Sequence, residues 1–506
     1  MPAASPAVPT LTPDLARDLR QDLTDAHFTS DHLEELLDAP TRAALEREDP
    51  IPALRALAGR SDAASVLFTV FALGRSVPVD ALAGALPRTG GAVEGLGLVR
   101  ITDGTAHPLF ELQPYTATDD AGEIQWWILS DLSELATGQP LPPDHVLGVG
   151  GASLTLARIT PRDRVGRALD LGCGGGIQAL HLARHAEQVV ATDLSSRALA
   201  VAAVNAALNG IDLDLREGSL LEPVAGETFD LIVSNPPFVI SPSTGAETWT
   251  YRDGGEPGDR LLARLLADLP AHLVPGGRAV MLGNWEITDP EHWDAHPRAW
   301  LERTGLDALV LQREVSDPAA YAGTWARDGG VTPRDAHWVD LIGAWLDDFA
   351  ARRVQGVGFG WILLQRPADA PGPGVVTEHV TTHGTGTLAP NLWESLAQRR
   401  RLAALDDDQL FSLHAVRADE VRERRHLVPG HVDPELIELV QGAGLGRIVR
   451  ADQVLAATVG ACDGELSLGQ ILAAVCALTG EDLDTTRERT APQLRDLLAW
   501  GLLREG

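Results

Sequence analysis

The sequence contains no lysine, and this absence excludes one class of nucleotide-binding site. All 41 basic residues of the 506-residue chain are arginine. A P-loop needs a lysine after its glycines to hold nucleotide phosphates, so no segment here can form one. Alanine, glycine and proline are abundant, a bias typical of GC-rich genomes, so single arginines indicate less about function than usual.

Cysteines are few, and long apolar runs are missing. Cys173, Cys462 and Cys476 form no CxxC pair and no His/Cys cluster, so we expect three reduced thiols and no metal site. No apolar run reaches the roughly 18 residues that span a bilayer. The N-terminus has no basic region followed by an apolar core, as a signal peptide would. We therefore expect a cytoplasmic protein without a membrane partner.

Negative charge dominates, with a net charge of −30 and a pI of about 4.8. Such a chain repels phosphate backbones over long range, which disfavours nucleic acid as a partner. A local basic groove would still suffice. The clusters Arg399–Arg401 and Arg422–Arg425 are the candidates, although we favour solvated helix faces as their explanation.

The length predicts about three domains. Residues 1–140 are predicted as a helical, winged-helix-like domain, and 141–367 as an α/β catalytic domain with a helical insertion at 317–353. A Pro/Gly-rich linker at 366–375 would end it. Residues 376–506 are predicted as a mainly helical, winged-helix-like domain.

The flanking regions have recognisable patterns. In the first, a mobile leader over about 1–30 precedes the predicted elements, which are helices at 31–37, 61–73 (with Ser61 as N-cap) and 77–86, and a ribbon of strands at 98–101 and 109–112. In the last, the expected helices are 453–459, 468–478 and 491–502. Acidic residues outnumber arginines in both 61–116 and 432–506, which does not favour DNA binding.

The central region alternates strands with helices, which predicts a parallel, doubly wound, Rossmann-like sheet of seven strands. The expected strands are 167–171, 188–192, 213–217, 229–234, 278–282, 308–312 and 357–364.

A glycine-rich loop, Asp170-Leu171-Gly172-Cys173-Gly174-Gly175-Gly176, follows the first of these strands. Glycines at that position let the backbone approach a ligand closely, and the spacing GxGxG differs from the dinucleotide pattern GxGxxG. Asp193 ends the second strand, where a carboxylate can accept hydrogen bonds from both ribose hydroxyls. Together they predict a nucleoside site. Ser219 and Leu220 end the third strand and either cover an adenine ring or form an ordinary turn.

The fourth strand ends in Asn235-Pro236-Pro237-Phe238, the most specific pattern in the chain. Proline fixes φ and removes an N–H, so the carbonyls there are held outward. The Asn235 oxygen and the Pro236 carbonyl can both accept hydrogen bonds from one –NH2 group, and Phe238 can stack on the planar group that carries it. Two acceptors aim the weak nitrogen lone pair at an electrophile, so the motif predicts catalysis by positioning and electrostatics.

In order and spacing, the glycine loop, Asp193 and Asn235–Phe238 resemble class I S-adenosylmethionine-dependent N-methyltransferases. The wider context, Ser234–Pro242 followed by Gly254-Gly255 and Pro275-Gly276-Gly277, resembles the HemK-type enzymes, which methylate the glutamine amide of release factors. The same four-residue motif also resembles ribosomal RNA guanine and DNA or RNA adenine methyltransferases.

This resemblance implies S-adenosyl-L-methionine as the cofactor and Asn235, Pro236, Pro237 and Phe238 as the catalytic residues. The implied cofactor-binding residues are Asp170, Gly172, Cys173, Gly174, Gly176, Asp193, Leu194, Ser219, Leu220, Asn235 and Gly150. Residues 144–157 would cover the methionine end. Two positions depart from the pattern, because relatives often have Asp at Ser219, and HemK-type enzymes usually have Tyr at Phe238.

Three functions follow as alternatives. The first is methylation of a glutamine amide in a protein such as a translation factor. The second is methylation of an adenine or guanine amine in ribosomal RNA or DNA, and the third is a catalytically inactive module that binds S-adenosylmethionine. The acidic charge and the extended motif favour the protein substrate, whereas Phe238 and the flanking modules favour nucleic acid.

Overall fold

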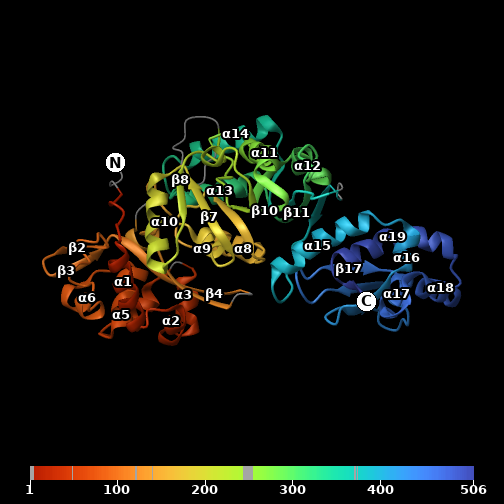
Figure 1. Ribbon diagram of the computed structural model, residues 1–506, viewed down its shortest axis with the longest axis horizontal. Coiled ribbons are helices and arrows are strands. Elements are labelled where there is room, and N and C mark those ends of the chain that lie inside the picture. Colours follow the sequence, from red (N-terminus) through yellow and green to blue (C-terminus); the bar gives the residue numbers. More distant parts are fainter. Residues whose placement is uncertain are drawn as a thin grey trace.

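The computed structural model describes residues 5–47, 49–119, 122–138, 141–242, 255–369, 372 and 374–506. The chain forms three parts in a row, which Figure 1 colours from red through green to blue. A large sheet with helices on both faces lies in the middle. In the described parts of the chain, no helix is long and apolar enough to cross a bilayer.

The central sheet confirms the predicted doubly wound α/β fold, with the strand order β13-β11-β12-β10-β9-β6-β7-β8. All neighbouring strands are parallel except β12, which is antiparallel to β10 and β11. The strands are β6 (Val165–Leu171), β7 (Ala186–Asp193), β8 (Asp214–Glu217), β9 (Phe229–Ser234), β10 (Leu273–Ile287), β11 (Asp307–Ser316), β12 (Gly356–Gln365) and β13 (Val375–His379).

The prediction of seven strands is wrong by one. The eighth strand, β13, begins at Val375, inside the segment expected to be a linker, and pairs with β11 at the edge of the sheet. Its five residues are only partly buried, so they carry no strong apolar pattern that sequence reasoning could detect.

Helices cover both faces of this sheet, which explains its apolar strands. Along β9, Leu231 and Val233 pack into one core layer, and Ile232 packs into the other. The covering helices are α8 (Gly151–Ile159), α9 (Ile177–Leu182), α10 (Ser196–Asn209), α11 (Arg260–Asp268) and α12 (Ala295–Leu301), with short 3-10 turns at Glu222–Val224, Leu269–His272 and Pro290–His292.

The N-terminal part is more ordered than expected, because the predicted leader contains a helix. Thr12 caps this helix, α1, and Leu19 and Leu23 are buried in the core. Asp62, not Ser61, caps α5. The helices are α1 (Pro13–Asp25), α2 (Ser30–Leu36), α3 (Ala39–Leu45), α4 (Ile51–Leu57), α5 (Ala63–Leu67, continued by a π turn Phe68–Ala72), α6 (Val79–Ala85) and α7 (Glu134–Thr137).

The first strand of the predicted ribbon is found, but the second is placed too late in the chain. The structure pairs β2 (Val99–Thr102) with β3 (Thr105–Pro108), and β1 (Val77–Pro78) completes the sheet in the order β1-β3-β2. The run expected as the second ribbon strand begins a separate hairpin instead. Polar residues alternate with apolar ones in both segments, so the sequence pattern does not separate them. The winged-helix assignment stays a prediction.

That hairpin, β4 (Phe110–Asp119) and β5 (Gly122–Asp131), fastens the N-terminal part to the sheet. Asn205 of α10 accepts a hydrogen bond from the Leu129 N–H at 2.7 Å and donates one to the Leu129 carbonyl at 3.1 Å. Asn209 bonds Trp127 in the same way. The two asparagine side chains thus form the backbone hydrogen bonds that a neighbouring strand would otherwise form with β5.

The C-terminal part has strands as well as the expected helices, so the description as mainly helical is incomplete. Its helices are α15 (Leu388–Ala403), α16 (Asp407–Ser412), α17 (Gln453–Gly460), α18 (Leu468–Thr479) and α19 (Leu483–Ala499). Its strands are β14 (His414–Arg417), β15 (Arg422–His426), β16 (Leu436–Val440), β17 (Ile448–Ala451), β18 (Asp463–Ser467) and β19 (Leu503–Glu505). The cluster Arg422–Arg425 therefore lies on an exposed strand, not on a helix.

The other arginine cluster forms ion pairs between the parts of the chain, so its interpretation as a solvated helix face is wrong. Arg399 lies 2.6 Å from Glu378 of β13, and Arg447 lies 2.8 Å from the same carboxylate. Arg400 pairs with Asp307 of β11 at 2.9 Å. Burial opposes ionisation of Glu378, but Arg447 and Arg399 outweigh it and lower the pKa of that carboxyl.

We expect Glu378→Gln to lower the unfolding midpoint of the C-terminal part. It removes the charged partner that Arg399 and Arg447 share, and Arg399 keeps only a longer pair with Asp496 at 3.3 Å. Breaking a buried pair costs about 3–5 kcal/mol. Because the folded pKa of Glu378 is lowered, its contribution is present at neutral pH and is lost as pH falls through that pKa. Urea unfolding at several pH values measures both effects, with exposed Glu488→Gln as control. Equal midpoints for Glu378→Gln and the wild type at neutral pH would contradict the role.

Candidate active site

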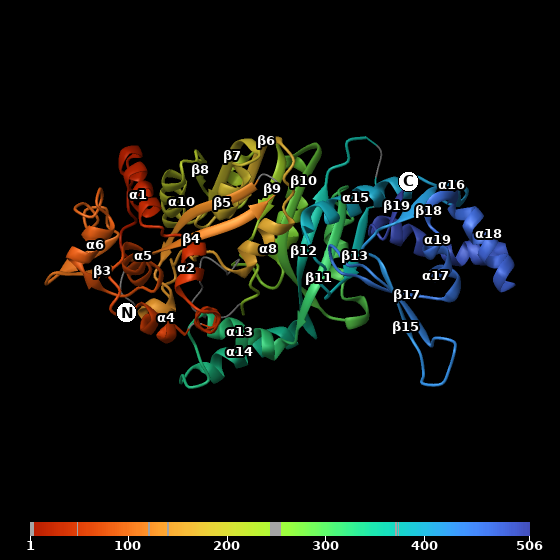
Figure 2. The same ribbon diagram turned by 90° about the horizontal axis from the view of Figure 1, so that it is seen from below.

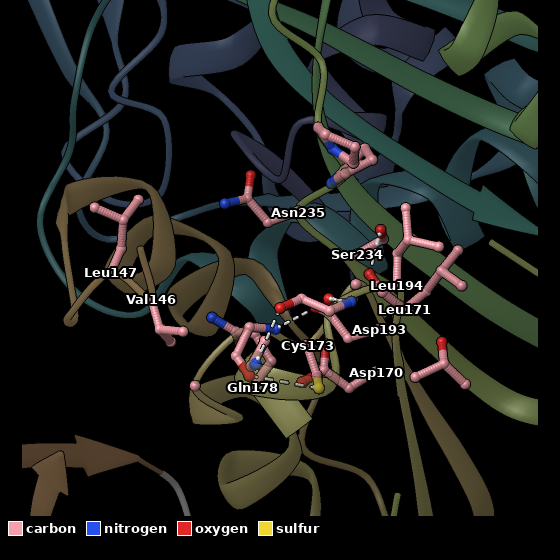
Figure 3. A pocket seen from close by; sticks show the side chains of 18 of the residues that line it. Val146, Leu147, Asp170, Leu171, Cys173, Gln178, Asp193, Leu194, Ser234 and Asn235 are labelled. Atoms are coloured by element: carbon pink, nitrogen blue, oxygen red, sulfur yellow. Dashed lines mark hydrogen bonds between the residues drawn. The ribbon is translucent and has the colours of Figure 1, made fainter. Parts of the chain in front are cut away.

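A cavity of about 420 Å³ lies at the carboxyl ends of the central strands. Parallel strands bring their carboxyl ends to one edge, and ligands of doubly wound sheets bind there. Figure 3 shows Val146 and Leu147 on one side of this cavity and Asp193 and Leu194 on the other, with Asn235 at a third side.

The glycine loop gives the cavity its floor. Gly172 and Gly174 line the cavity and have φ values of 72° and 53°, which favour glycine. Neither has another atom within 4 Å of the position of an added Cβ, so their cavity side is open. Gly176 does not line the cavity. Its φ is 84° and it faces Ala202 of α10, so it serves helix packing.

Asp193 joins the ends of β6 and β7. Its Oδ2 accepts a hydrogen bond from the Gly174 N–H at 2.8 Å, and its Oδ1 accepts one from the Ser195 N–H at 2.8 Å. Each carboxylate oxygen can accept more than one hydrogen bond, so the group remains able to bind hydroxyls. Burial raises the pKa of Asp193.

The other polar groups of the loop are Asp170, which supports the loop's structure, and the unreactive thiol of Cys173. Asp170 is buried and accepts a hydrogen bond from the Ala179 N–H of α9 at 2.8 Å. Burial raises the pKa of Asp170 to about 7. Burial, with Asp170 and Asp193 nearby, also raises the pKa of the Cys173 thiol, so this lining residue is not a nucleophile at neutral pH.

Residues 144–150, here called the cover segment, form another wall. Asp131 at the end of β5 accepts a hydrogen bond from the Val146 N–H at 2.8 Å and pairs with Arg197 of α10. Gly150 lines the cavity as the N-cap of α8. His145, within the segment predicted to cover the methionine end, is buried and lines the cavity, and burial lowers its pKa.

Leu194, Ser219 and Leu220, all predicted as cofactor-binding residues, line the cavity. Two further lining residues, Leu261 and Arg264, come from α11. No sequence motif marks them, because they are distant in sequence from the glycine loop. Gly254, part of the wider pattern noted above, lies outside the described residues.

The catalytic motif divides between cavity and core. Asn235, Pro236 and Pro237 line the cavity. The Asn235 Oδ1 is buried and accepts no hydrogen bond from the described residues, so it is an acceptor that a bound –NH2 group would satisfy. Phe238, expected to stack on the target, is not a lining residue and packs against the apolar cluster of Leu156 and Leu231.

A tyrosine distant in sequence holds the far end of the motif. The Ile240 N–H donates to the Tyr321 hydroxyl at 2.9 Å, and the Asn284 amide donates to the same oxygen at 2.8 Å. Tyr321 is 1% exposed and packs with Trp345 and Phe349. The separation of 81 positions between Ile240 and Tyr321 explains why sequence reasoning missed this contact.

Comparison with known proteins identifies the central part. Residues 148–292 match the family model described as methyltransferase small domain. Residues 25–109 match a second model, described as domain of unknown function DUF7059.

The curated relatives that this chain resembles are named for different targets. The chain is 38% identical over 160 residues to release factor glutamine methyltransferase of Xylella fastidiosa, covering 29% of this chain and 56% of that protein. It is 36% identical over 185 residues to ribosomal protein uL3 glutamine methyltransferase of Bradyrhizobium diazoefficiens, covering 34% and 57%. It is 32% identical over 122 residues to ribosomal RNA small subunit methyltransferase C of Alcanivorax borkumensis, covering 24% and 33%.

The chain thus spans about half the length, or less, of these relatives. Among solved structures, it is 21% identical to a T. Thermophilus 16S rRNA N2 G1207 methyltransferase in complex with AdoMet and guanosine. That match covers 41% of this chain and 55% of the other, with a TM-score of 0.25. Among the described residues, no group of three His, Cys, Asp or Glu side chains could hold a metal ion.

The cavity of the methyltransferase small domain fits S-adenosylmethionine. Its volume suits a nucleoside with a short tail. Asp193 would hold the ribose hydroxyls, Ser219 and Leu220 the adenine, and the cover segment the methionine end. The open cavity side of Gly172 and Gly174 leaves room for the sulfonium region.

We expect Asp193→Ala to weaken cofactor binding by about 2–4 kcal/mol, because two hydrogen bonds to a charged acceptor are lost. Calorimetry with S-adenosylmethionine measures this, with exposed Asp212→Ala as control. In the wild type, affinity should fall as pH drops through the raised pKa of Asp193, which lies above the ordinary value of 3.8. An unchanged affinity for Asp193→Ala would remove this residue from the site.

We expect Tyr321→Phe to lower turnover while leaving cofactor affinity unchanged. The substitution leaves the buried Ile240 N–H without its acceptor, a cost of about 1–3 kcal/mol, and loosens the catalytic motif. Tyr115→Phe is the matched control, since it removes a buried hydroxyl that bonds His181 at 2.9 Å elsewhere in the fold. Equal turnover for Tyr321→Phe and the wild type would mean that the contact does not position the motif.

Proposed function

We propose that this chain is an S-adenosylmethionine-dependent N-methyltransferase that methylates a glutamine side-chain amide in a protein. The observation that carries the proposal is the buried Asn235 Oδ1, which lacks a donor among the described residues and belongs to the wall of the cofactor cavity. Such an atom suits a planar –NH2 group that enters beside the cofactor.

The chain's own residues act by binding and orienting this group. The Asn235 oxygen accepts one hydrogen of the amide –NH2, and the Pro236 carbonyl accepts the other. Because proline has no N–H and a fixed φ, this carbonyl turns outward without losing a backbone hydrogen bond. The two bonds reduce delocalisation of the nitrogen lone pair and aim it toward the cavity.

S-adenosylmethionine supplies an electrophilic methyl group when it is bound. The target nitrogen loses one proton after it gains the methyl group. The cavity wall needs no strong base for this, since the N-protonated product is very acidic and releases its proton to water. The pKa of Asp170 is about 7, but this carboxyl already accepts the Ala179 N–H and serves the loop.

Several observations favour a protein target. Two of the relatives cited above are named for glutamine in a release factor and in ribosomal protein uL3. The net charge of −30 opposes the approach of a phosphate backbone. An enzyme with such a substrate would work on the translation machinery, in the cytoplasm.

A second candidate function is methylation of a nucleobase amine. It is favoured by the relative named for ribosomal RNA and by Phe238, a residue type commoner among those enzymes. The third, an inactive module, has less support, because Gly172, Asp193 and Asn235 are all present at the cavity.

Labelled cofactor tests the proposal directly. The protein is incubated with cell lysate and S-adenosylmethionine that carries a tritiated methyl group, and samples are then digested with protease or with nuclease. We expect protease, not nuclease, to release the label from the macromolecular fraction. Release by nuclease would replace the protein target with nucleic acid, and no incorporation would favour the inactive module.

We expect Asn235→Ala to reduce turnover by about 10²-fold or more, as does the loss of other groups that stabilise a reacting atom. Cofactor affinity should stay nearly the same, because Asp193 and the glycine loop are intact. Asn235→Asp keeps an acceptor and should retain partial activity. Steady-state kinetics at saturating cofactor, with calorimetry beside them, separate the two effects. A wild-type rate in Asn235→Ala would show that the motif is structural.

A further inference from the structure

A helical hairpin stands at the edge of the sheet that holds the cavity. Its helices, α13 (Pro318–Asp328) and α14 (Trp338–Arg352), connect β11 to β12. Since β11 is parallel to the nucleotide-binding strands and β12 is antiparallel, the connection leaves and re-enters the sheet at its cavity edge. Figure 2 shows α13 and α14 side by side at that end of β11 and β12.

This hairpin packs against the chain that follows the catalytic motif. Tyr321 of α13 bonds the Ile240 N–H, two residues after the catalytic motif. Val239 and Ile240 are buried in one apolar cluster with Trp345 and Phe349 of α14. The hairpin therefore fixes the position of the residues directly after the motif.

The outer face of α14 is apolar although it faces solvent. Val339, Gly343, Leu346 and Ala350 follow the spacing i, i+4, i+7, i+11, which places them on one stripe of the helix. Val339 is 75% exposed and Leu346 is 36% exposed. A solvent-facing stripe of this kind, beside an active site, is typical of a binding surface.

Acidic residues accompany the stripe. Asp340 and Asp347 directly follow Val339 and Leu346 and are exposed along the same side of α14. The structure gives neither of them an ion-pair partner among the described residues. An apolar stripe with free carboxylates beside it matches a partner segment that is both apolar and basic.

We propose that the outer face of α14 docks a basic, amphipathic segment of the substrate protein and so presents its glutamine to Asn235. This inference rests on the proposed function and adds the surface that selects the substrate. Nucleic acid fits this face poorly, because two carboxylates would meet phosphates and no arginine lies on the stripe. Tyr321 connects the hairpin that carries this face to the residues directly after the catalytic motif.

Two pairs of substitutions separate the apolar and the charged contributions. Val339→Ser with Leu346→Ser removes the apolar stripe, and Asp340→Arg with Asp347→Arg reverses the charge. The matched control reverses two exposed acids at similar positions of another helix, Asp484→Arg with Glu488→Arg on α19. All three leave the cavity wall intact, so cofactor affinity, measured by calorimetry, should equal that of the wild type.

The probes are purified release factor and ribosomal protein uL3 from the cell that makes this chain, with tritiated S-adenosylmethionine as donor. We expect KM for the methylated protein to rise about tenfold in each α14 variant, the size of a contact worth 1.4 kcal/mol, with kcat within about twofold. The wild-type KM should increase with salt, and the charge-reversed variant should lose that dependence.

The outcomes separate the two proposals. An unchanged KM in both α14 variants, with an active wild type, would overturn the docking surface and leave the proposed function standing. A wild type that methylates ribosomal RNA but neither protein would overturn the proposed function and this inference with it. An equal rise of KM in the α19 control would show that net charge, not the α14 face, controls substrate binding, and would also overturn the inference.

Discussion

The hydrogen bond from the Gly174 N–H to Asp193 connects the two strand ends on which the cofactor cavity depends. It holds the glycine loop after β6 against the end of β7, and the Ser195 bond fixes the same carboxylate from the other side. The loop in turn needs positive φ values at Gly172 and Gly174, which a side chain would strain. The cavity exists because parallel strands, small residues and one buried carboxylate coincide at one edge of the sheet.

Two elements that flank the sheet add contacts to this edge. The N-terminal part reaches it through β5, whose last residue, Asp131, holds the cover segment. The α13–α14 hairpin reaches it through Tyr321, which holds the chain beyond the catalytic motif. The C-terminal part is fixed to the opposite side of the sheet through Glu378 and two arginines. Two of these three elements, the N-terminal part and the α13–α14 hairpin, thus contact the site where we propose that the methyl group is transferred.

The sequence predicted those features of the fold and the site that depend on residues adjacent in the chain. The strand Phe229–Ser234, the glycine loop and Asp193 could be placed from the sequence, because apolar runs, glycines and a strand-end acid are adjacent in the chain. The sequence could not reveal Tyr321 or Arg264, since each reaches the site through tertiary packing with no motif of its own. Phe238 was misjudged for a related reason, as an aromatic side chain after Pro-Pro can turn toward core or cavity. β13 escaped prediction because an edge strand of five half-buried residues has little apolar contrast.

The central claim is that Asn235 and Pro236 present a protein amide to the methyl donor. The most direct measurement is mass spectrometry of the labelled protein fraction, digested to peptides and fragmented to locate the added methyl group. Our account predicts one methyl group on the side-chain nitrogen of a glutamine, lost when the enzyme carries Asn235→Ala. A methyl group found only on a nucleobase, or on another protein atom such as a carboxylate oxygen, would contradict it.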